Sequence, residues 1–230
     1  MTYVGRRRRL SFRVSEELKI RRALLAERLG SQRYSWPALN ELDRKVMPYL
    51  PDGPGTFLEI GANDGYSQSN TWQLERARGW KGILIEPLPS LFRVCQRTRG
   101  RSTCFNVACV GDPGTTSVKV VDRALESVTL NQQDSDEERG RLEGGGGRLR
   151  QVPARTLSSL IDESPMESIT FMSVDVEGAE LAVFGGVDWE RHTPDWMLVE
   201  TDNRDAVLSA CPTLRFEAQL SFHDYLLRRG

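Results

Sequence analysis

The stretch TFLEIGANDG at residues 56–65, together with ILIEP at residues 83–87, decides the fold of this chain. Each is a short apolar run with a carboxylate near its end, Glu59 in the first and Glu86 in the second. A parallel strand buried on both faces reads as a continuous apolar run, and ligands of open α/β sheets lie beyond the carboxyl ends of such strands. The two segments therefore predict neighbouring parallel strands whose acidic ends form the floor of a nucleoside site.

The glycines of this turn indicate which nucleoside is bound. A dinucleotide site has the pattern G-x-G-x-x-G, but this chain has E-x-G-x-x-x-G, with Glu59 two residues before Gly61. A carboxylate there repels a pyrophosphate and suits the amino group and sulfonium of S-adenosylmethionine. Gly61 and Gly65 let the backbone turn sharply and approach the ligand. The pattern favours methyl transfer over hydride transfer.

Several segments resemble the FkbM family of S-adenosylmethionine-dependent methyltransferases, in family order over residues 55–228. They are FLEIGANDG at 57–65, SQSNT at 67–71, GWKGILIEP at 79–87, ARTL at 154–157 and SVDVEGAEL at 173–181. The resemblance implies a class I Rossmann-like fold and S-adenosylmethionine as cofactor. It also implies O-methylation of a sugar or a secondary metabolite, as in natural product biosynthesis. Residues 1–33 show no such resemblance.

Strands and helices alternate from residue 56 onward, which is typical of a parallel sheet. Strands are expected at 56–60, 82–86, 102–110, 169–175 and 196–201, helices at 68–78, 88–98, 178–184 and 203–210, and a closing hairpin at 214–220 and 225–228. These elements predict an α/β fold whose mostly parallel seven-stranded sheet is flanked by helices and ends in an antiparallel hairpin.

The chain is expected to form one methyltransferase domain at 55–230, preceded by a helical extension at 1–54. An insertion at 111–155 contains a strand at 115–121 and a polar stretch at 131–147 that ends in four glycines. A long connection of this kind is a lid, a binding loop or plain disorder, and we expect a flap near the acceptor site.

The extension begins with a basic leader. Residues 1–33 carry ten Lys or Arg and three Asp or Glu, although the whole chain has a net charge of −1. Such a leader is a solvated terminus, or it contacts nucleic acid, an acidic lipid surface or a neighbouring subunit. Ser15 is expected to cap a helix that runs to about Arg28, and a second helix is expected at 37–50.

Composition indicates a cytoplasmic protein without a membrane span. No apolar run approaches the roughly 20 residues that a membrane helix needs, and no apolar region follows the basic start as in a signal peptide. The four cysteines show no C-x-x-C pairing and are expected to be reduced thiols: Cys95, Cys104, Cys109 and Cys211.

Cofactor contacts are expected from five places. The turn after the first strand supplies Glu59, Gly61, Asn63, Asp64 and Gly65, most of them at the amino-acid end of the cofactor. Ser69 and Asn70, at the start of the next helix, are expected to hold its carboxylate. Glu86 accepts hydrogen bonds from the ribose hydroxyls. The end of the third strand is expected to read the adenine edge with Asn106, Val107 and Ala108, and Asp175 reaches the cofactor from the fourth strand.

Candidate catalytic residues are the acids at the ends of later strands. Asp175 and Glu200 each close an apolar strand, Glu177 follows Asp175, and clustered carboxylates raise one another's pKa toward the range useful for a base. His223, in the hairpin turn, is a further candidate base. Alternatively, Glu177 and its neighbour Glu180 only favour a helix N-terminus. Asp175, Glu177 and Glu200 also offer oxygen ligands for magnesium, although neither the spacing nor the resemblance demands a metal.

Three functions remain open from the residues. The leading one is O-methylation of a small-molecule acceptor, by a chain that forms a homo-oligomer or acts alone. Nucleic-acid methylation is suggested by the basic leader alone, because no N-P-P-Y type target-base motif is present. The third is a module that binds the nucleoside without catalysis and serves as an assembly partner.

Overall fold

The computed structural model describes residues 3–123, 126–129 and 148–230. Its main sheet has seven strands in the order β10-β11-β9-β8-β1-β2-β3. Their bounds are β1 Thr56–Ile60, β2 Lys81–Ile85, β3 Thr103–Phe105, β8 Phe171–Val174, β9 Trp196–Glu200, β10 Leu214–Gln219 and β11 Asp224–Arg229. Strands β9, β8, β1, β2 and β3 are parallel, and β11 and β10 close the sheet in antiparallel register. The predicted fold class is confirmed.

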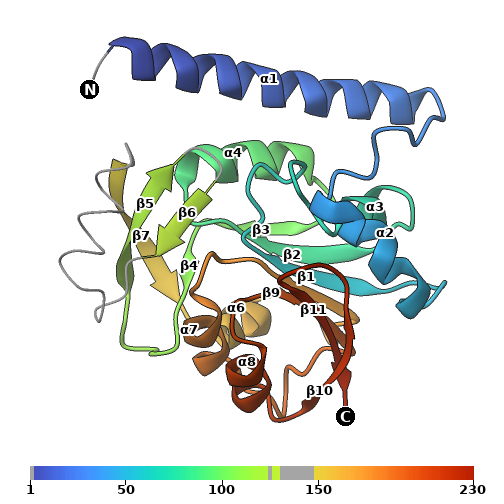
Figure 1. The fold of residues 1–230 in the computed structure, drawn as a ribbon, viewed down its shortest axis with the longest axis vertical. Helices are drawn as coiled ribbons and strands as arrows, with labels where there is room; N and C mark the ends of the chain where they lie inside the picture. The colour runs from blue at the N-terminus through green and yellow to red at the C-terminus, as the bar shows by residue number, and fades with distance from the viewer. Residues whose placement is uncertain (1–2, 124–125, 130–147) are drawn as a thin grey trace.

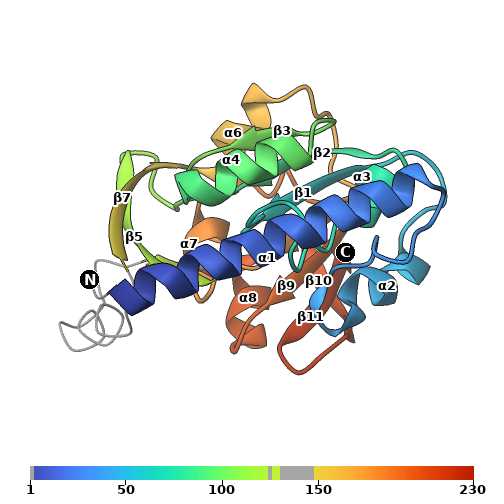
Figure 2. The same cartoon turned by 90° about the horizontal axis from the view of Figure 1, so that it is seen from above.

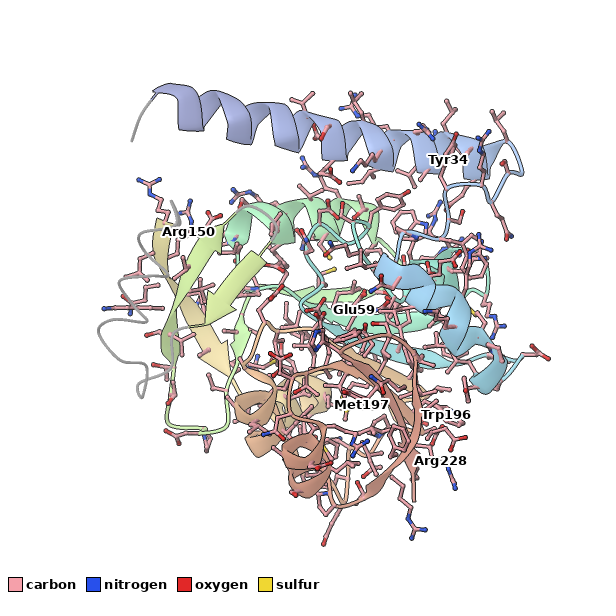
Figure 3. The ribbon with its side chains drawn as sticks, in the orientation of Figure 1. Tyr34, Glu59, Arg150, Trp196, Met197 and Arg228 are labelled. Atoms are coloured by element: carbon pink, nitrogen blue, oxygen red, sulfur yellow. The ribbon has the colours of Figure 1, made fainter. Side chains whose placement is uncertain are left out.

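Helices cover both faces of this sheet (Figure 1). One face carries α2 Leu42–Val46, α3 Trp72–Arg76 and α4 Pro89–Thr98, and the other carries α6 Leu157–Glu163, α7 Glu180–Gly185 and α8 Arg204–Ala210. Side chains along a strand alternate between faces, so Phe57 packs with Leu74 of α3 whereas Leu58 packs with Leu160 of α6. Glu59 shares the face of Phe57, and Figure 3 shows it in the interior of the molecule.

A second, four-stranded sheet lies beside the β3 edge of the first (Figure 1). Its order is β4-β7-β5-β6, with β4 Ala108–Cys109, β5 Ser117–Arg123, β6 Glu126–Thr129 and β7 Arg148–Arg155. Strand β5 pairs antiparallel with both β6 and β7. The predicted flap at 131–147 lies outside the described residues, but the strand expected at 115–121 is present as β5.

The N-terminal helix α1, Tyr3–Arg28, crosses one side of the body as its outermost element (Figures 1 and 2). Its contacts to the body come from the buried residues Ile20 and Ala23, which pack with Tyr66 and Trp72. Glu27 accepts hydrogen bonds from Trp72 Nε1 and Arg76 Nε, both at 2.8 Å. Figure 3 shows Tyr34 just beyond the end of this helix.

Several predicted helix boundaries are wrong. The helix expected from Ser15 begins at Tyr3 instead. The helix expected at 37–50 is broken into a 3-10 turn at Leu39–Glu41, α2 and a second 3-10 turn at Met47–Tyr49. Asn40 and Glu41 have left-handed φ angles of 52° and 58°, and Pro48 lacks the N–H that a helix interior needs.

Two further elements differ from the prediction. The strand expected at 102–110 is split, because the chain leaves the main sheet after Phe105 and joins the second sheet at Ala108. The helix expected at 68–78 is limited to Trp72–Arg76, since Gln68 has a left-handed φ of 64°. Along the described part of the chain, no helix is long and apolar enough to cross a membrane.

Candidate active site

A cavity lies at the carboxyl ends of β1, β2 and β8, and we refer to it as the strand-end cavity. Its lining includes ten predicted site residues: Glu59, Gly61, Asn63, Ser69, Asn70, Glu86, Val107, Ala108, Asp175 and Glu177. Apolar walls are added by Leu91 of α4 and Val183 of α7. Parallel strands bring their carboxyl ends to one edge of the sheet, which is why residues far apart in the chain meet here.

Glu86 is the most deeply placed acid of the strand-end cavity, with 2% of its surface exposed. Its Oε2 accepts a hydrogen bond from the Asn63 backbone N–H at 2.9 Å, and its Oε1 accepts one from the Leu88 backbone N–H at 2.8 Å. Burial raises the pKa of Glu86 to about 8, against the opposing effect of these two N–H donors. The side chain is thus fixed in orientation, and each oxygen retains a further lone pair for a ligand hydroxyl.

Glu59 is held by protein groups on both oxygens. Oε1 accepts the Asn70 backbone N–H at 2.9 Å, and Oε2 accepts the hydroxyls of Ser69 at 3.0 Å and Thr71 at 2.7 Å. The guanidinium of Arg99 lies 3.4 Å from the same Oε2. These contacts show that Glu59 shapes the loop at 69–71, which bounds the cavity.

Arg99, just after α4, is the central residue that the sequence interpretation missed. Its side chain is fully buried and donates to Ser69 Oγ, to the Gly65 carbonyl and to Glu75 Oε2, at 3.1, 3.0 and 3.0 Å. It therefore compensates two buried carboxylates, Glu59 and Glu75, and joins β1, α3 and α4 beneath the cavity.

Backbone conformation is unusual around the cavity. Gly61 has a φ of 88°, and a Cβ atom there would lie 1.8 Å from the Asp175 carbonyl oxygen. The lining residues Asn63, Gln68 and Glu177 also have left-handed φ angles, of 51°, 64° and 52°. Such conformations cost free energy for side chains other than glycine and concentrate at ligand sites.

Three predicted cofactor residues lie outside the cavity lining. Asp64 accepts the backbone N–H groups of Tyr66 and Ser67 at 2.9 and 2.7 Å, so it stabilises the turn. Gly65 packs against Thr98 and Arg99, where a Cβ would lie 2.8 Å from each side chain. Asn106 donates to the carbonyls of Glu86 and Pro87, at 2.8 and 2.9 Å, and thereby holds the end of β2. The structure gives all three a supporting place beside the ligand site.

Ser69 and Asn70 line the cavity, but most of their polar groups are already committed. Ser69 Oγ donates to Glu59 and accepts from Thr71 and Trp72. Asn70 gives its backbone N–H to Glu59 and its Nδ2 to Ser173 Oγ, the latter at 3.0 Å. The backbone N–H and one Nδ2 hydrogen of Asn70 are therefore bound within the protein, whereas the sequence interpretation expected these groups to hold a ligand carboxylate. Its Oδ1, by contrast, is buried and has no hydrogen-bond partner in the described structure.

Asp175 and Glu200 form a carboxyl pair at the ends of the neighbouring strands β8 and β9. They are joined by a side-chain hydrogen bond, which lowers the pKa of Glu200 and partly offsets the effect of its burial. Burial, followed by the charges of Glu200 and Glu177, raises the pKa of Asp175 well above its usual range. Burial also dominates the net upward shift in the pKa of Glu200. Both carboxyl groups therefore favour the protonated form more than an exposed side chain does, Asp175 more strongly than Glu200.

A second cavity, the hairpin cavity, adjoins the first. It is lined by Leu39, Asn40, Leu42, Gln68, Asn70, Val174, Asp175, Glu177, Leu198, Glu200, Ser221, Phe222, His223 and Asp224, and its volume is about 320 Å³. Gln68, Asn70, Asp175 and Glu177 belong to both linings. All four predicted catalytic residues therefore border one continuous site. His223 is half exposed at its outer rim, and its Nδ1 lies 2.9 Å from Asp202 Oδ1.

Other lining residues had no separate signal in the sequence. Ser173 is buried and anchors Asn70, while Cys109 and Val176 add apolar surface. Their places depend on tertiary packing rather than on a local pattern. Within the described ranges, no group of three or more His, Cys, Asp or Glu side chains is arranged to hold a metal ion.

Comparisons with solved structures find several methyltransferases of low sequence identity. The chain is similar in structure to a TehB-like SAM-dependent methyltransferase from Corynebacterium glutamicum, with 9% identity, a TM-score of 0.46 and coverage of 94% of this chain and 99% of that one. It is also similar to an O-methyltransferase from Bacillus cereus solved in complex with SAH, with 11% identity, a TM-score of 0.43 and coverage of 91% and 89%. A search of curated proteins finds no match.

The family comparison covers most of the chain. Residues 59–222 match the model of the methyltransferase FkbM domain, a range that begins at Glu59 and ends beside His223. It contains the complete strand-end cavity and both members of the carboxyl pair. The chain belongs to the FkbM family of S-adenosylmethionine-dependent methyltransferases.

Proposed function

We propose that this chain transfers the methyl group of S-adenosylmethionine to a hydroxyl of a small molecule, a sugar or a secondary metabolite. The observation that carries the proposal is the junction of the two cavities. The strand-end cavity and the hairpin cavity share Gln68, Asn70, Asp175 and Glu177, so a donor in the first faces an acceptor in the second. Methyl transfer requires this in-line arrangement of two bound reactants.

The residues of the strand-end cavity fit the cofactor. Along the strand order, Val107 and Ala108 lie at one end of the lining, followed by Glu86 and then by Gly61 and Asp175. We assign these positions to the adenine, the ribose and the amino-acid end of the cofactor, in that order. Asn63 Oδ1, which is buried without a partner among the described residues, is an acceptor available to a ligand N–H or O–H.

The size of the strand-end cavity implies movement on binding. Its volume is about 60 Å³, whereas small-molecule pockets typically measure about 300–1,000 Å³. Seating the nucleoside therefore requires the lining to open. Cofactor binding is expected to bring a change in the loop at 67–71.

Once bound, the cofactor supplies an electrophilic methyl group, whose transfer leaves the electron pair of the broken S–C bond on sulfur. The protein has to align the acceptor oxygen, exclude water and remove the hydroxyl proton. We assign Glu200 as the base for this proton, because it lines the hairpin cavity and its partner Asp175 lines both cavities. General-base catalysis of this kind contributes about 10²–10⁴-fold.

Two substitutions test the proposal. Glu86→Ala should abolish the heat of S-adenosylhomocysteine binding in calorimetry, because the ribose loses its acceptor. Glu200→Gln should retain that binding within about twofold and lower turnover of labelled cofactor by about 10²–10⁴-fold. Unchanged cofactor binding in Glu86→Ala contradicts the cofactor site, and full turnover in Glu200→Gln contradicts the assigned base. Mass spectrometry of extracts incubated with the labelled cofactor identifies the acceptor.

A further inference from the structure

The entrance to the acceptor side of this site is acidic. Next to the hairpin cavity lies a groove of about 820 Å³, lined by Glu177, Gly178, Ala179, Glu180, Leu181, Ala182, Glu200, Thr201, Asp202, Asn203 and His223. The hairpin cavity and this groove share Glu177, Glu200 and His223. Together their linings contain six carboxyl side chains: Asp175, Glu177, Glu180, Glu200, Asp202 and Asp224.

Among the described residues that line the two spaces, acids outnumber basic side chains. Of the residues that the structure describes, no lysine or arginine lines either space. His223 is the one basic residue in the two linings, and it is engaged with Asp202. Lys45 is close enough to lower the pKa of Asp224, but its Nζ donates to the Leu220 carbonyl at 2.7 Å and it lies outside the lining. An acceptor that enters this space meets a negative potential.

A separate observation points to a ligand rich in hydrogen-bond donors. Asn70 is 7% exposed, lines both the strand-end cavity and the hairpin cavity, and has its Nδ2 bound to Ser173. Its Oδ1 remains without a hydrogen-bond partner among the described residues. A buried acceptor without a donor costs free energy, which a bound N–H or O–H group would recover.

The lining of the hairpin cavity also includes apolar side chains. Phe222, at the tip of the β10–β11 hairpin, is 83% exposed, and Leu39 is 54% exposed. Both line the cavity together with the acids. An aromatic face beside a carboxylate cluster suits a ring that carries polar groups on one edge.

From these observations we propose that the acceptor carries a protonated amine close to the hydroxyl that is methylated, as in an amino-substituted sugar ring. This inference rests on the proposed methyl transfer and specifies its substrate class. An ammonium offers three donors and a positive charge, which match Asn70 Oδ1 and the carboxylates. A phosphate-bearing acceptor is disfavoured by the same field, which argues against nucleic acid as the substrate.

The test measures binding to the full-length protein saturated with S-adenosylhomocysteine. The probes are methyl glucoside and its four analogues in which one hydroxyl, at C2, C3, C4 or C6, is replaced by an amine. At least one amine should bind about tenfold more tightly than the parent glycoside at low salt, and this preference should shrink at 300 mM salt. If no amine exceeds the parent, the inference is overturned.

Two variants test whether the carboxylates of the groove cause the preference for amines. Glu180→Gln combined with Asp202→Asn removes two charges from the groove while keeping the Glu180 side-chain acceptor of the Gly178 N–H. This double variant should bind the parent and the amines within about twofold of each other. The control is Asp205→Asn, which removes an exposed carboxylate of α8 that pairs with Arg204 outside the lining, and it should keep the preference. An equal loss in the control, or no loss in the double variant, contradicts the groove as the cause.

The two proposals fail in distinguishable ways. If S-adenosylhomocysteine itself does not bind, the proposed methyl transfer is wrong and this inference falls with it. If it binds and the amines show no advantage, methyl transfer stands and only the cationic acceptor class is rejected.

Discussion

At the scale of single residues, Glu86 shows how burial prepares a binding group. The strand ends at a carboxylate that is 2% exposed, and desolvation raises its pKa to about 8 although two N–H groups oppose the shift. Below that pH the free protein keeps the carboxyl group protonated. Ribose hydroxyls donate hydrogen bonds, so they favour the ionised form.

The expected consequence is proton release on binding. At pH 7, binding of S-adenosylhomocysteine should release about one proton, and at pH 9 none, because Glu86 is already ionised there. Calorimetry in buffers of different ionisation enthalpy measures this number. Glu86→Gln, which cannot ionise, is the control and should release none at either pH. A wild-type value near zero at pH 7 contradicts the assignment.

Gly61 lies where the structure leaves no space for a side chain. Substitution by alanine combines a φ of 88° with a Cβ placed 1.8 Å from the Asp175 carbonyl. Overpacking and left-handed strain together should lower the free energy of unfolding by about 2–4 kcal/mol in urea denaturation. Gly79→Ala is the matched control, since Gly79 has a φ of 71° with nothing within 4 Å, and it should cost about 1 kcal/mol. Equal losses in the two variants would show that the close approach of β1 and β8 is unimportant.

At the scale of elements, the sequence predicted strands better than helices. The apolar runs at β1 and β9 are continuous and buried on both faces, so their bounds agree with the structure to within one residue. The helix expected at 37–50 was wrong because two left-handed residues and Pro48 interrupt it. Strand β7 was missed because its sequence contains three arginines and Pro153. With most of its residues exposed, the sequence shows no clear alternation of apolar and polar residues.

The buried arginine connects three of these elements. Arg99 follows the polar run Gln96–Thr98, and nothing local distinguishes it from a surface residue; only the tertiary fold places it between Glu59 and Glu75. Arg99→Met should lower the free energy of unfolding by about 3–5 kcal/mol, because two buried carboxylates lose their compensating charge. Chemical denaturation measures this loss.

The matched variant for Arg99 is Arg97→Met, which alters an exposed position of α4 and should change stability by less than about 0.5 kcal/mol. S-adenosylhomocysteine affinity should also fall in the folded Arg99 variant, since the loop at 69–71 loses its anchor. If Arg99→Met is as stable as Arg97→Met, the ion pairs and hydrogen bonds around Glu59 make no net contribution to the free energy of unfolding.

At the scale of the whole molecule, the order of the strands arranges the site. Adjacent strands β3, β2, β1, β8 and β9 carry, in this order along one sheet edge, the residues that we propose for the adenine, the ribose, the amino-acid end and the base. The alternating pattern predicted this edge and with it Glu59, Glu86, Asp175 and Glu200. It did not predict which polar side-chain atoms would be hydrogen-bonded within the protein. The hydrogen-bond partners of Asp64, Ser69 and Asn70 depend on the conformation of the loop and on residues that are distant in the sequence.

The N-terminal helix α1 covers one side of the molecule, and its described contacts with the body are made by its C-terminal half. Glu16 accepts a hydrogen bond from Ser67, Ile20 and Ala23 cover Tyr66 and Trp72, and Glu27 binds Trp72 and Arg76. All these contacts follow residue 15. Deletion of residues 1–14 leaves all of these contacts in place, and we expect it to change the free energy of unfolding by less than about 1 kcal/mol.

Deletion of residues 1–34 should have a much larger effect. It exposes Trp72, which is fully buried, and should cost at least about 3 kcal/mol, or a fall in Tm of about 6–12 °C. Cofactor affinity should fall as well, because Ser67, which borders the strand-end cavity, loses Glu16. Thermal unfolding and calorimetry of the two deletions compare the segments directly. A loss in the shorter deletion as large as in the longer one would place the stabilising contacts in the basic leader instead.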